Sequence, residues 1–315
     1  MSYSSTGRST SLCQVTGWHS ISGLGDAHQA WKWSDRPSKL LRFGSIPKRI
    51  YRGYSDRGGP RTVGGNGWFL FEIFIGARAM EEKVDYTYED ISKMIDHSLL
   101  APTLTDGELE SGCRLAVLYN VATVCIKPYF VRQCAELLAP SDVKPSTTVG
   151  FPHGGHTTRI KVAEAEAAIE DGAEELDMVV NIGKVLSEDW AFVEADIRAV
   201  LEVVREHGKV LKVIFENCYL QDTHKIRLCE ICGELGVDFV KTSTGYGEGG
   251  ATVEDIRLMR QHCPPHVQIK AAGGIRTLDK LLEMRALGVT RVGATRTVDI
   301  LEECRRRINQ AKRAE

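Results

Sequence analysis

Residues 238–245 read Asp-Phe-Val-Lys-Thr-Ser-Thr-Gly, and residues 267–274 read Val-Gln-Ile-Lys-Ala-Ala-Gly-Gly. Each segment is an apolar, strand-like run that ends in a lysine and continues into small, glycine-containing residues. A single lysine at a strand end usually pairs with a carboxylate or extends its ammonium group to solvent. Two lysines in the same setting, Lys241 and Lys270, instead favour amine chemistry at one shared site.

The alternation of short β-branched runs with longer helical patterns extends from about residue 85 onward and indicates a parallel sheet covered by helices. We predict eight strands: Lys93–His97, Ala122–Lys127, Ser146–Phe151, Glu175–Asn181, Val210–Glu216, Phe239–Thr244, Val267–Ala271 and Arg291–Thr295. Eight strands in roughly 230 residues match an α/β fold of the (β/α)8 TIM-barrel type. The alternative, an open doubly wound sheet, is disfavoured because no Gly-x-Gly-x-x-Gly follows the first strand.

Two of the connecting segments show helical periodicity of their apolar residues, Thr157–Asp171 and Asp189–His207. Glycines follow at positions typical of helix C-terminal caps, because glycine adopts the left-handed conformation without steric cost. We therefore expect Gly172, Gly208 and Gly236 to end helices.

Composition describes an ordinary soluble protein: 43% of the 315 residues are hydrophobic, 26% are charged and the formal net charge is −2. This charge gives no reason to expect nucleic acid or an anionic membrane as a partner. No apolar run reaches the roughly 20 residues that a membrane-spanning helix needs. The nine cysteines are odd in number and scattered, which favours a reducing, cytoplasmic location. Cys229 and Cys232 fit one helix face better than a metal site.

Residues 1–79 differ from the rest of the chain, because they are rich in Ser, Gly and Arg and hold eleven Lys or Arg against four Asp or Glu. Three interpretations stay open: an organelle transit peptide, a disordered partner-binding tail, and a true start of translation at Met80. We favour the start at Met80. We expect residues 1–79 to be an extension of low order without chemistry, and residues 80–315 to form the barrel domain.

The active site of such a barrel lies where the strands end, so polar residues late in the strands should converge on one mouth. The candidates are Asp96, Cys125, Asp177, Lys212, Lys241 and Lys270. Lysines at similar depth on the sixth and seventh strands can be neighbours, since adjacent strands are about 4.8 Å apart. A buried Asp177 would be costly unless it pairs with one of them.

The two lysines together form a candidate Schiff-base site. A lysine amine attacks a carbonyl only when unprotonated, and an exposed lysine with a pKa near 10.4 is almost wholly charged at neutral pH. Burial and a second ammonium group lower this pKa, and a shift of roughly 3 units corresponds to about 4 kcal/mol. Lys241 and Lys270 could supply both conditions for one another.

Phosphate binding is predicted at the loops after the seventh and eighth strands, where many such barrels hold a phosphate through backbone N–H groups. Gly273 and Gly274 follow the seventh strand, and Gly293-Ala294-Thr295 closes the eighth. Arg276 and Arg296 are near enough in sequence to add positive charge.

Other polar residues carry less weight. His153 and His156 lack a third ligand at zinc spacing, so a loop-positioning role is expected. Asp171, Glu174 and Glu175 resemble a solvated helix end and not an acid–base pair. Cys125 has no histidine placed to activate it and is expected to line the pocket.

Several strings resemble the deoxyribose-phosphate aldolase family, a family of class I aldolases, across about residues 88–310. The strings are Ile-Asp-His-Ser-Leu-Leu (95–100), Val-Cys-Ile (124–126), Val-Gly-Phe-Pro-His-Gly (149–154), Glu-Leu-Asp-Met-Val-Val (175–180), Leu-Lys-Val-Ile-Phe-Glu (211–216) and Phe-Val-Lys-Thr-Ser-Thr-Gly (239–245). They occur in the family order, whereas residues 1–79 have no counterpart.

The resemblance implies an aldehyde-lyase of deoxyribose phosphate catabolism, which reversibly cleaves 2-deoxy-D-ribose 5-phosphate into D-glyceraldehyde 3-phosphate and acetaldehyde. It implies no metal and no organic cofactor, and it implies a homodimer. Lys241 would form the Schiff base, Lys270 would lower its pKa, and Asp177 would relay protons with Lys270. The implied substrate-binding residues are Asp96, Cys125, Lys212, Thr242, Gly245, Gly273, Gly274, Gly293 and Thr295.

The chain departs from the family pattern after its seventh and eighth strands. Ala271 stands where a proline is common, and Thr295-Arg296 replaces a pair of small serines. These departures put phosphate affinity in question and leave the Schiff base untouched. Two other functions compete: a lysine-dependent aldolase of a different phosphorylated sugar, and a non-catalytic sugar-phosphate-binding barrel.

Overall fold

The computed structural model describes residues 84–314. The predicted extension at residues 1–79 lies outside the described residues, as do residues 80–83 and Glu315, so the domain boundary at Met80 stays a prediction. Between residues 84 and 314, none of the helices combines the length and the apolar character needed to cross a membrane.

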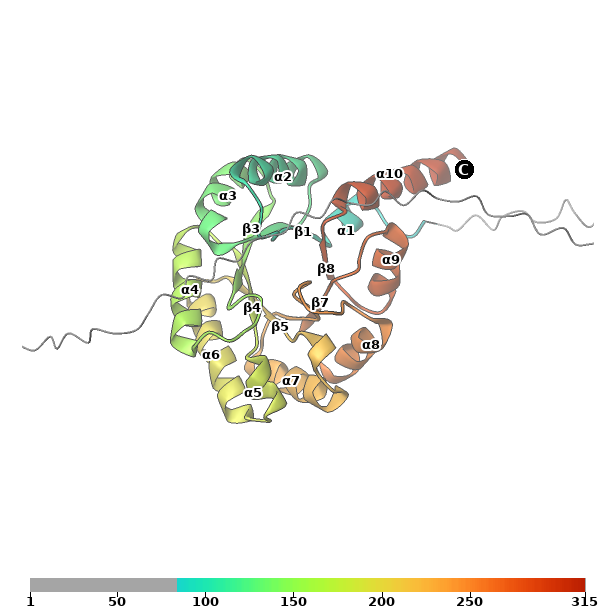
Figure 1. Ribbon diagram of the computed structural model, residues 1–315. Helices are drawn as coiled ribbons and strands as arrows, with labels where there is room; N and C mark the ends of the chain where they lie inside the picture. Colours follow the sequence, from blue (N-terminus) through green and yellow to red (C-terminus); the bar gives the residue numbers. More distant parts are fainter. Residues whose placement is uncertain (1–83, 315) are drawn as a thin grey trace, which may run out of the picture. The chain divides into compact units, whose positions relative to one another are not determined.

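Eight parallel strands close into a barrel in their sequence order, with β8 paired to β1, and Figure 1 shows the helices surrounding this ring. The strands are β1 (Ile95–Leu99), β2 (Thr123–Ile126), β3 (Lys144–Val149), β4 (Glu175–Val179), β5 (Val210–Ile214), β6 (Phe239–Lys241), β7 (Gln268–Ala272) and β8 (Arg291–Ala294). The predicted (β/α)8 TIM barrel is therefore confirmed, and each predicted strand overlaps an observed one.

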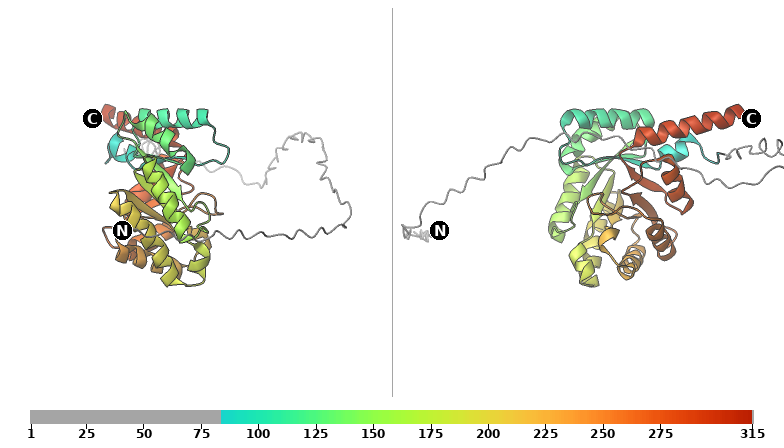
Figure 2. Two further views of the ribbon diagram at one scale, coloured as in Figure 1. Left: turned by 90° about the vertical axis from the view of Figure 1, so that its left-hand side faces the viewer. Right: turned by 45° about the vertical axis from the view of Figure 1, so that its right-hand side comes forward.

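The helices connect consecutive strands on the outside of the barrel, and α10 leads to the C-terminus (Figures 1 and 2). They are α1 (Tyr88–Ser92), α2 (Asp106–Tyr119), α3 (Val131–Leu138), α4 (Thr158–Glu170), α5 (Ile182–Leu186), α6 (Trp190–Glu206), α7 (Asp222–Leu235), α8 (Val253–His262), α9 (Leu278–Ala286) and α10 (Thr297–Ala314). Two short 3-10 helices, η1 (Pro128–Phe130) and η2 (Asn217–Tyr219), follow β2 and β5.

Local sequence explains where these helices begin and end. Thr105 caps α2: its hydroxyl accepts a hydrogen bond from Glu108 N, and the Glu108 carboxylate accepts one from Thr105 N. The predicted glycine caps are confirmed, since Gly172, Gly208 and Gly236 all have a positive φ just after α4, α6 and α7.

Strand boundaries were the less accurate part of the prediction. β1 begins at Ile95 because Lys93 still caps α1 with its backbone N–H. β6 was predicted to reach Thr244 but ends at Lys241. The chain therefore leaves the barrel immediately after Lys241, which puts this lysine at the end of its strand.

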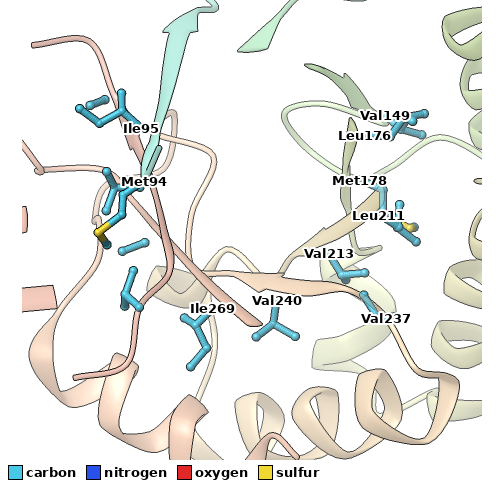
Figure 3. Close-up of a cluster of buried hydrophobic side chains, with 14 of the residues drawn as sticks. Met94, Ile95, Val149, Leu176, Met178, Leu211, Val213, Val237, Val240 and Ile269 are labelled. Carbon is cyan, nitrogen blue, oxygen red and sulfur yellow. The ribbon is translucent and has the colours of Figure 1, made fainter. Parts of the chain in front are cut away.

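The apolar core lies between the barrel and the helices. Figure 3 shows Val240 and Ile269 pointing from β6 and β7 toward the surrounding helices, and both are fully buried. Alternate residues of a strand face opposite sides, so their neighbours Lys241 and Lys270 face the barrel interior. The apolar layer stabilises the barrel from outside, by about 1.5–3 kcal/mol for each large side chain, and leaves the interior to polar groups.

Candidate active site

Lys241 and Lys270 lie side by side in the barrel. Their Cα atoms are register partners of the β6–β7 pair. Lys241 is 3% exposed and Lys270 is 1% exposed, so both amines are removed from bulk water. The predicted pairing of the two lysines at one depth is borne out by this register.

Asp177 on β4 joins the two lysines. Its Oδ2 atom lies 2.7 Å from Lys241 Nζ and 2.6 Å from Lys270 Nζ, and its Oδ1 atom lies 2.8 Å from Lys212 Nζ. One fully buried carboxylate therefore accepts hydrogen bonds from three lysines. Burial alone would raise the pKa of Asp177, but Lys212, Lys241 and Lys270 together hold it well below the usual value, so Asp177 is ionised.

Lys241 differs from the other two lysines in the direction of its pKa shift. Burial lowers its pKa, and the ammonium group of Lys270 lowers it further, against the opposing effect of Asp177. Lys270 and Lys212 are buried as deeply, but Asp177 raises the pKa of each, with Asp96 adding to this effect on Lys270 and Glu175 on Lys212. Lys241 is consequently the lysine that most easily supplies a neutral amine.

Asp96 on β1 extends the cluster across the barrel. One of its carboxylate oxygens lies 2.5 Å from Lys270 Nζ, and the other accepts a hydrogen bond from Arg291 Nη1 at 2.8 Å. Burial alone would raise the pKa of Asp96, but Lys270 and Arg291 lower it strongly. Asp96 thus keeps Lys270 charged without touching Lys241.

Glu175 is a corrected prediction. Glu175 begins β4, as the predicted strand Glu175–Asn181 does, but the expected solvated setting is wrong. Glu175 is 7% exposed and pairs with Lys212 at 2.6 Å and with Arg291 at 2.8 Å. The missed signal is its spacing from Asp177, because residues two apart on one strand face the same side. Arg291 was not predicted as a site residue either. It lies two residues before Gly293 on β8, so the same spacing would have placed it on the interior side.

The charges inside the barrel nearly balance. The interlinked groups comprise four cations, Lys212, Lys241, Lys270 and Arg291, and three carboxylates, Asp96, Glu175 and Asp177. With every group ionised, the cluster carries one excess positive charge, which is costly in a buried site. Loss of one proton removes this excess, and Lys241 is the cation whose pKa is lowered.

Cys125 and Thr242 lie beside the lysines, one with a neutral thiol and the other with a hydroxyl that is already hydrogen-bonded. Cys125 on β2 is 1% exposed, and burial together with the Asp177 carboxylate raises the pKa of its thiol. It therefore lines the site as a neutral side chain. The Thr242 hydroxyl is occupied by the backbone of Ala272, to which it donates at 3.2 Å and from which it accepts at 3.1 Å. Thr242 thus hydrogen-bonds the residue after β6 to β7.

The glycines predicted to bind substrate, which are Gly245 and the three of the predicted phosphate loops, have three different settings. Gly273 (φ 81°) packs closely on Gly250, so a β-carbon would come within 2.7 Å of the Gly250 Cα atom. Gly274 (φ 86°) and Gly245 (φ 86°) have open space at the β-carbon position. Gly293 faces the interior, with Lys270 Cε 3.7 Å from its β-carbon position. Only Gly274 and Gly245 thus leave room for a ligand beside their backbone.

The polar residues at the strand ends are more open than the lysines. Thr295 and Arg276 are exposed, and Arg296 is exposed and lies 3.3 Å from Asp299 within α10. His153 and His156 are also exposed, and His156 lies 3.9 Å from Glu164. The mouth therefore presents cationic and hydroxyl groups above a buried, charged interior.

Glu216 shapes the loop that follows Lys241. It lies two residues after β5, in a left-handed conformation (φ 58°) that non-glycine residues rarely adopt, and it is 2% exposed. Its carboxylate accepts hydrogen bonds from the Thr244 hydroxyl and from Thr244 N at 3.2 Å. The loop at Gly245 is thereby held at the mouth, a role that the sequence alone did not indicate.

Comparison with known proteins gives concordant matches. A protein-family model described as DeoC/LacD family aldolase matches residues 90–294. The deoxyribose-phosphate aldolase of Rhodopirellula baltica is 63% identical over 224 residues, covering 71% of this chain and 93% of that protein. The enzyme of the same name from Thermococcus gammatolerans is 47% identical over 218 residues, covering 69% and 97%.

A solved structure matches the barrel as well. The chain named "QR15, an Aldolase" has a TM-score of 0.67 and 35% sequence identity, and the match covers 70% of this chain and 98% of that chain. The similarity therefore spans nearly the full length of these proteins, and it includes the strands that carry the buried lysines.

Proposed function

This chain belongs to the DeoC/LacD family of aldolases, and on that premise we propose that it reversibly cleaves 2-deoxy-D-ribose 5-phosphate into D-glyceraldehyde 3-phosphate and acetaldehyde through a Schiff base on Lys241. The observation that carries this proposal is the sharing of one buried oxygen, Asp177 Oδ2, by Lys241 and Lys270 at 2.7 and 2.6 Å. This arrangement places Lys241, whose pKa is lowered, beside the charged Lys270 and beside Asp177, which can accept a proton.

The reaction begins with the neutral amine of Lys241, which attacks the C1 aldehyde carbon of the open-chain sugar. The resulting carbinolamine takes up a proton on its hydroxyl group, which leaves as water, and a protonated imine forms. This imine accepts the electron pair of the C2–C3 bond as that bond breaks and the C3 hydroxyl loses its proton, which releases the phosphorylated aldehyde. The enamine left on Lys241 takes a proton at C2 and is hydrolysed to acetaldehyde and the free lysine.

Asp177 and Lys270 move the protons in these steps. The Asp177 carboxylate is held ionised, so it can accept a proton, and the Lys270 ammonium group beside it can donate one. Asp177 Oδ2 lies within hydrogen-bonding distance of the Lys241 amine, and Lys270 Nζ lies within hydrogen-bonding distance of the same oxygen. Asp96 and Lys212 support this relay by keeping Lys270 and Asp177 in their charged forms.

We propose that the 5-phosphate binds at the mouth, near Gly274, Thr295 and the N-terminus of α10. Gly274 has open space beside its backbone, and a helix N-terminus favours anions. Arg296 lies at the start of α10 and is exposed, so it can turn from Asp299 to a phosphate oxygen. Thr295→Ala and Arg296→Ala should therefore raise KM for the phosphorylated sugar more than for free deoxyribose.

Borohydride trapping tests the Schiff base directly. Incubation with 2-deoxyribose 5-phosphate and reduction should convert Lys241 to N-ethyllysine, which peptide mass mapping locates. A useful control within the same chain is Lys161, a buried lysine on α4, which should carry no adduct. If the folded protein gives no adduct with this sugar or with other aldehydes and ketones, a non-catalytic sugar-phosphate-binding barrel becomes the better interpretation.

We further propose that the protein is a cytoplasmic homodimer. The family resemblance supports the dimer. The cytoplasmic location is supported by the free thiols of the described residues, among them Cys113 and Cys134, whose Sγ atoms lie 3.7 Å apart without a disulfide. Light scattering coupled to size exclusion should give twice the chain mass of 34.9 kDa, and cell fractionation should recover the activity in the cytosol.

A further inference from the structure

We propose that Glu175 and Arg291 are a pair of positioning residues that set how Asp177 is shared among the three lysines of the site. Neither touches Lys241. Glu175 binds Lys212, which shares Asp177 with Lys241, and Arg291 binds Asp96, which in turn binds Lys270. The inference rests on the proposed function, since it concerns the residue that forms the Schiff base.

The pair spans the barrel from β4 to β8. Arg291 Nη1 donates to Glu175 at 2.8 Å and also to Asp96 at 2.8 Å, while Nη2 donates to Glu175 at 3.3 Å. The guanidinium group also lies over the Phe239 ring, 5.3 Å from its centroid. Four contacts thus fix a side chain that has only 14% of its surface exposed.

Glu175 acts through Lys212. Lys212 Nζ lies between Glu175, at 2.6 Å, and Asp177, at 2.8 Å. While Glu175 neutralises part of the Lys212 charge, Asp177 remains available to the other two lysines. Without Glu175, the nearest carboxylate to Lys212 would be Asp177, with Asp96 farther away at 3.8 Å. Lys212 would then draw more strongly on Asp177, and the ammonium form of Lys241 would lose support.

Arg291 acts in the opposite sense through Asp96. Asp96 lies between Arg291, at 2.8 Å, and Lys270, at 2.5 Å. Without Arg291, Asp96 would attract Lys270 more strongly and draw it from Asp177. Asp177 would then stabilise the ammonium form of Lys241 more fully, and Lys270 would repel it less.

The charged and titratable groups around Lys241 in the described barrel come from all sides. They are Asp96 on β1, Cys125 on β2, Glu175 and Asp177 on β4, Lys212 on β5, Lys270 on β7 and Arg291 on β8. From β3, the Ser146 hydroxyl accepts a hydrogen bond from Lys212 at 3.4 Å. Only Glu175 and Arg291 among the charged members lack direct contact with Lys241, Lys270 or Asp177.

The test compares Glu175→Gln, Arg291→Met and the double variant by the pH dependence of Lys241 labelling. Each protein is treated with acetaldehyde and cyanoborohydride over a pH series, and N-ethyllysine at position 241 is quantified by peptide mass mapping. Labelling needs the neutral amine, so its midpoint follows the pKa of Lys241 whether or not the protein cleaves a sugar. Retro-aldol activity is measured separately on the same samples.

The two single variants should shift the midpoint in opposite directions. Glu175→Gln should move it to lower pH and Arg291→Met to higher pH, each by about half to one unit. The double variant should return it close to wild type, because one charge of each sign is removed. Arg291→Lys keeps the positive charge and should also stay close to wild type, which provides a second measurement if Arg291→Met folds poorly.

A purely structural role predicts a different pattern. Shifts of the same sign, or no shift in any folded variant, would overturn the proposal. The matched control is the surface pair Arg227 and Glu230 on α7, 2.9 Å apart, whose Arg227→Met and Glu230→Gln variants should leave the midpoint unchanged. Absence of sugar cleavage together with the opposite shifts would remove the proposed function and keep the positioning role.

Discussion

Two regions of this molecule bury lysines against aspartates, and they do so with different results. Outside the barrel, Lys161 on α4 binds Asp196 on α6 at 2.6 Å and the Val179 carbonyl at 2.9 Å, and Asp196 accepts a second bond from Thr158 at 2.7 Å. Each charge there has a partner of its own. Inside the barrel, Lys241 shares Asp177 with two other lysines.

The difference shows that burial alone does not make a lysine reactive. Burial lowers the pKa of Lys161 as it does that of Lys241. Lys161, however, is 0% exposed and joins two helices to a strand end, whereas Lys241 ends its strand at the barrel mouth. A shared carboxylate and a position at the end of its strand distinguish the candidate nucleophile from the structural lysine, and the following predictions test that distinction.

The largest effect is expected for Lys241→Met, which removes the amine. Sugar cleavage should fall at least about 10⁴-fold, while the protein stays folded because one excess positive charge is removed from the barrel. The measurement is kcat/KM with a coupled assay, together with circular dichroism. Retention of more than a hundredth of the activity would show that another lysine forms the imine.

Lys270→Met tests whether the second lysine controls the first. Activity should fall by about 10²–10⁴-fold, as for loss of a general acid–base group. The repulsion between the two ammonium groups is also lost, so the pKa of Lys241 should rise. The rising limb of the pH–rate profile, which follows neutral Lys241, should therefore move to higher pH. If the rate falls but the rising limb of the profile stays at the same pH, Lys270 acts in proton transfer and does not control the pKa of Lys241.

Lys161→Met tests the other side of the comparison. Removing one partner leaves Asp196 as a buried, unpaired charge, so the free energy of unfolding should fall by about 3–5 kcal/mol. Urea denaturation measures this loss, and adding Asp196→Asn should restore part of it. The folded variant should keep kcat within about two-fold of wild type. A large fall in kcat would mean that the two regions are coupled.

The smallest effect concerns His97, which neighbours Asp96 on β1 but faces away from the barrel interior. Burial lowers its pKa to about 4, and its Nδ1 atom lies 2.8 Å from the Thr297 hydroxyl. The unfolded chain binds this proton at a higher pH, so the stabilisation is complete above about pH 6.5 and is lost as the pH falls toward 4. The loss should reach roughly 2–3 kcal/mol.

His97→Asn should make the free energy of unfolding depend less on pH between 6.5 and 4.5. Urea denaturation at a series of pH values between 6.5 and 4.5 gives the slope for both proteins. Asp96 and Asp177 lose their stabilising effect only at lower pH, below the pKa of an unfolded aspartate at about 3.9, because their pKa values in the folded protein are lowered. An equal slope in wild type and variant would assign the effect to other groups.

Much of the fold and the centre of the site could be predicted from local patterns. Strands and helices alternate with distinct periods, and the closing lysines of 238–245 and 267–274 marked two neighbouring strands whose register is now seen. Asp177 followed from the cost of burying an unpaired carboxylate. These features depend on residues near one another in sequence or on a single strong energetic rule.

What escaped prediction depends on contacts between distant strands. Glu175 lies beside Glu174 in the sequence, and its two-residue spacing from Asp177 indicates its face of the strand but not the partners that it meets there. Its partner Arg291 is 116 residues away. The loop after Lys241 is likewise held by a distant residue, since Thr244 N donates a hydrogen bond to Glu216, which follows β5. Pairings of this kind become visible only once the barrel is closed.

Closure of the barrel also constrains the order in which a chain can become active. Asp96 on the first strand meets Arg291 on the last, 195 residues later. A chain that still lacks β8 holds Asp96 and Glu175 without the cation that joins them. Contacts between such distant residues form late and slowly. The lysine site should therefore mature only with the final strand, and a chain stopped short of it should neither pack its interior nor react with aldehydes.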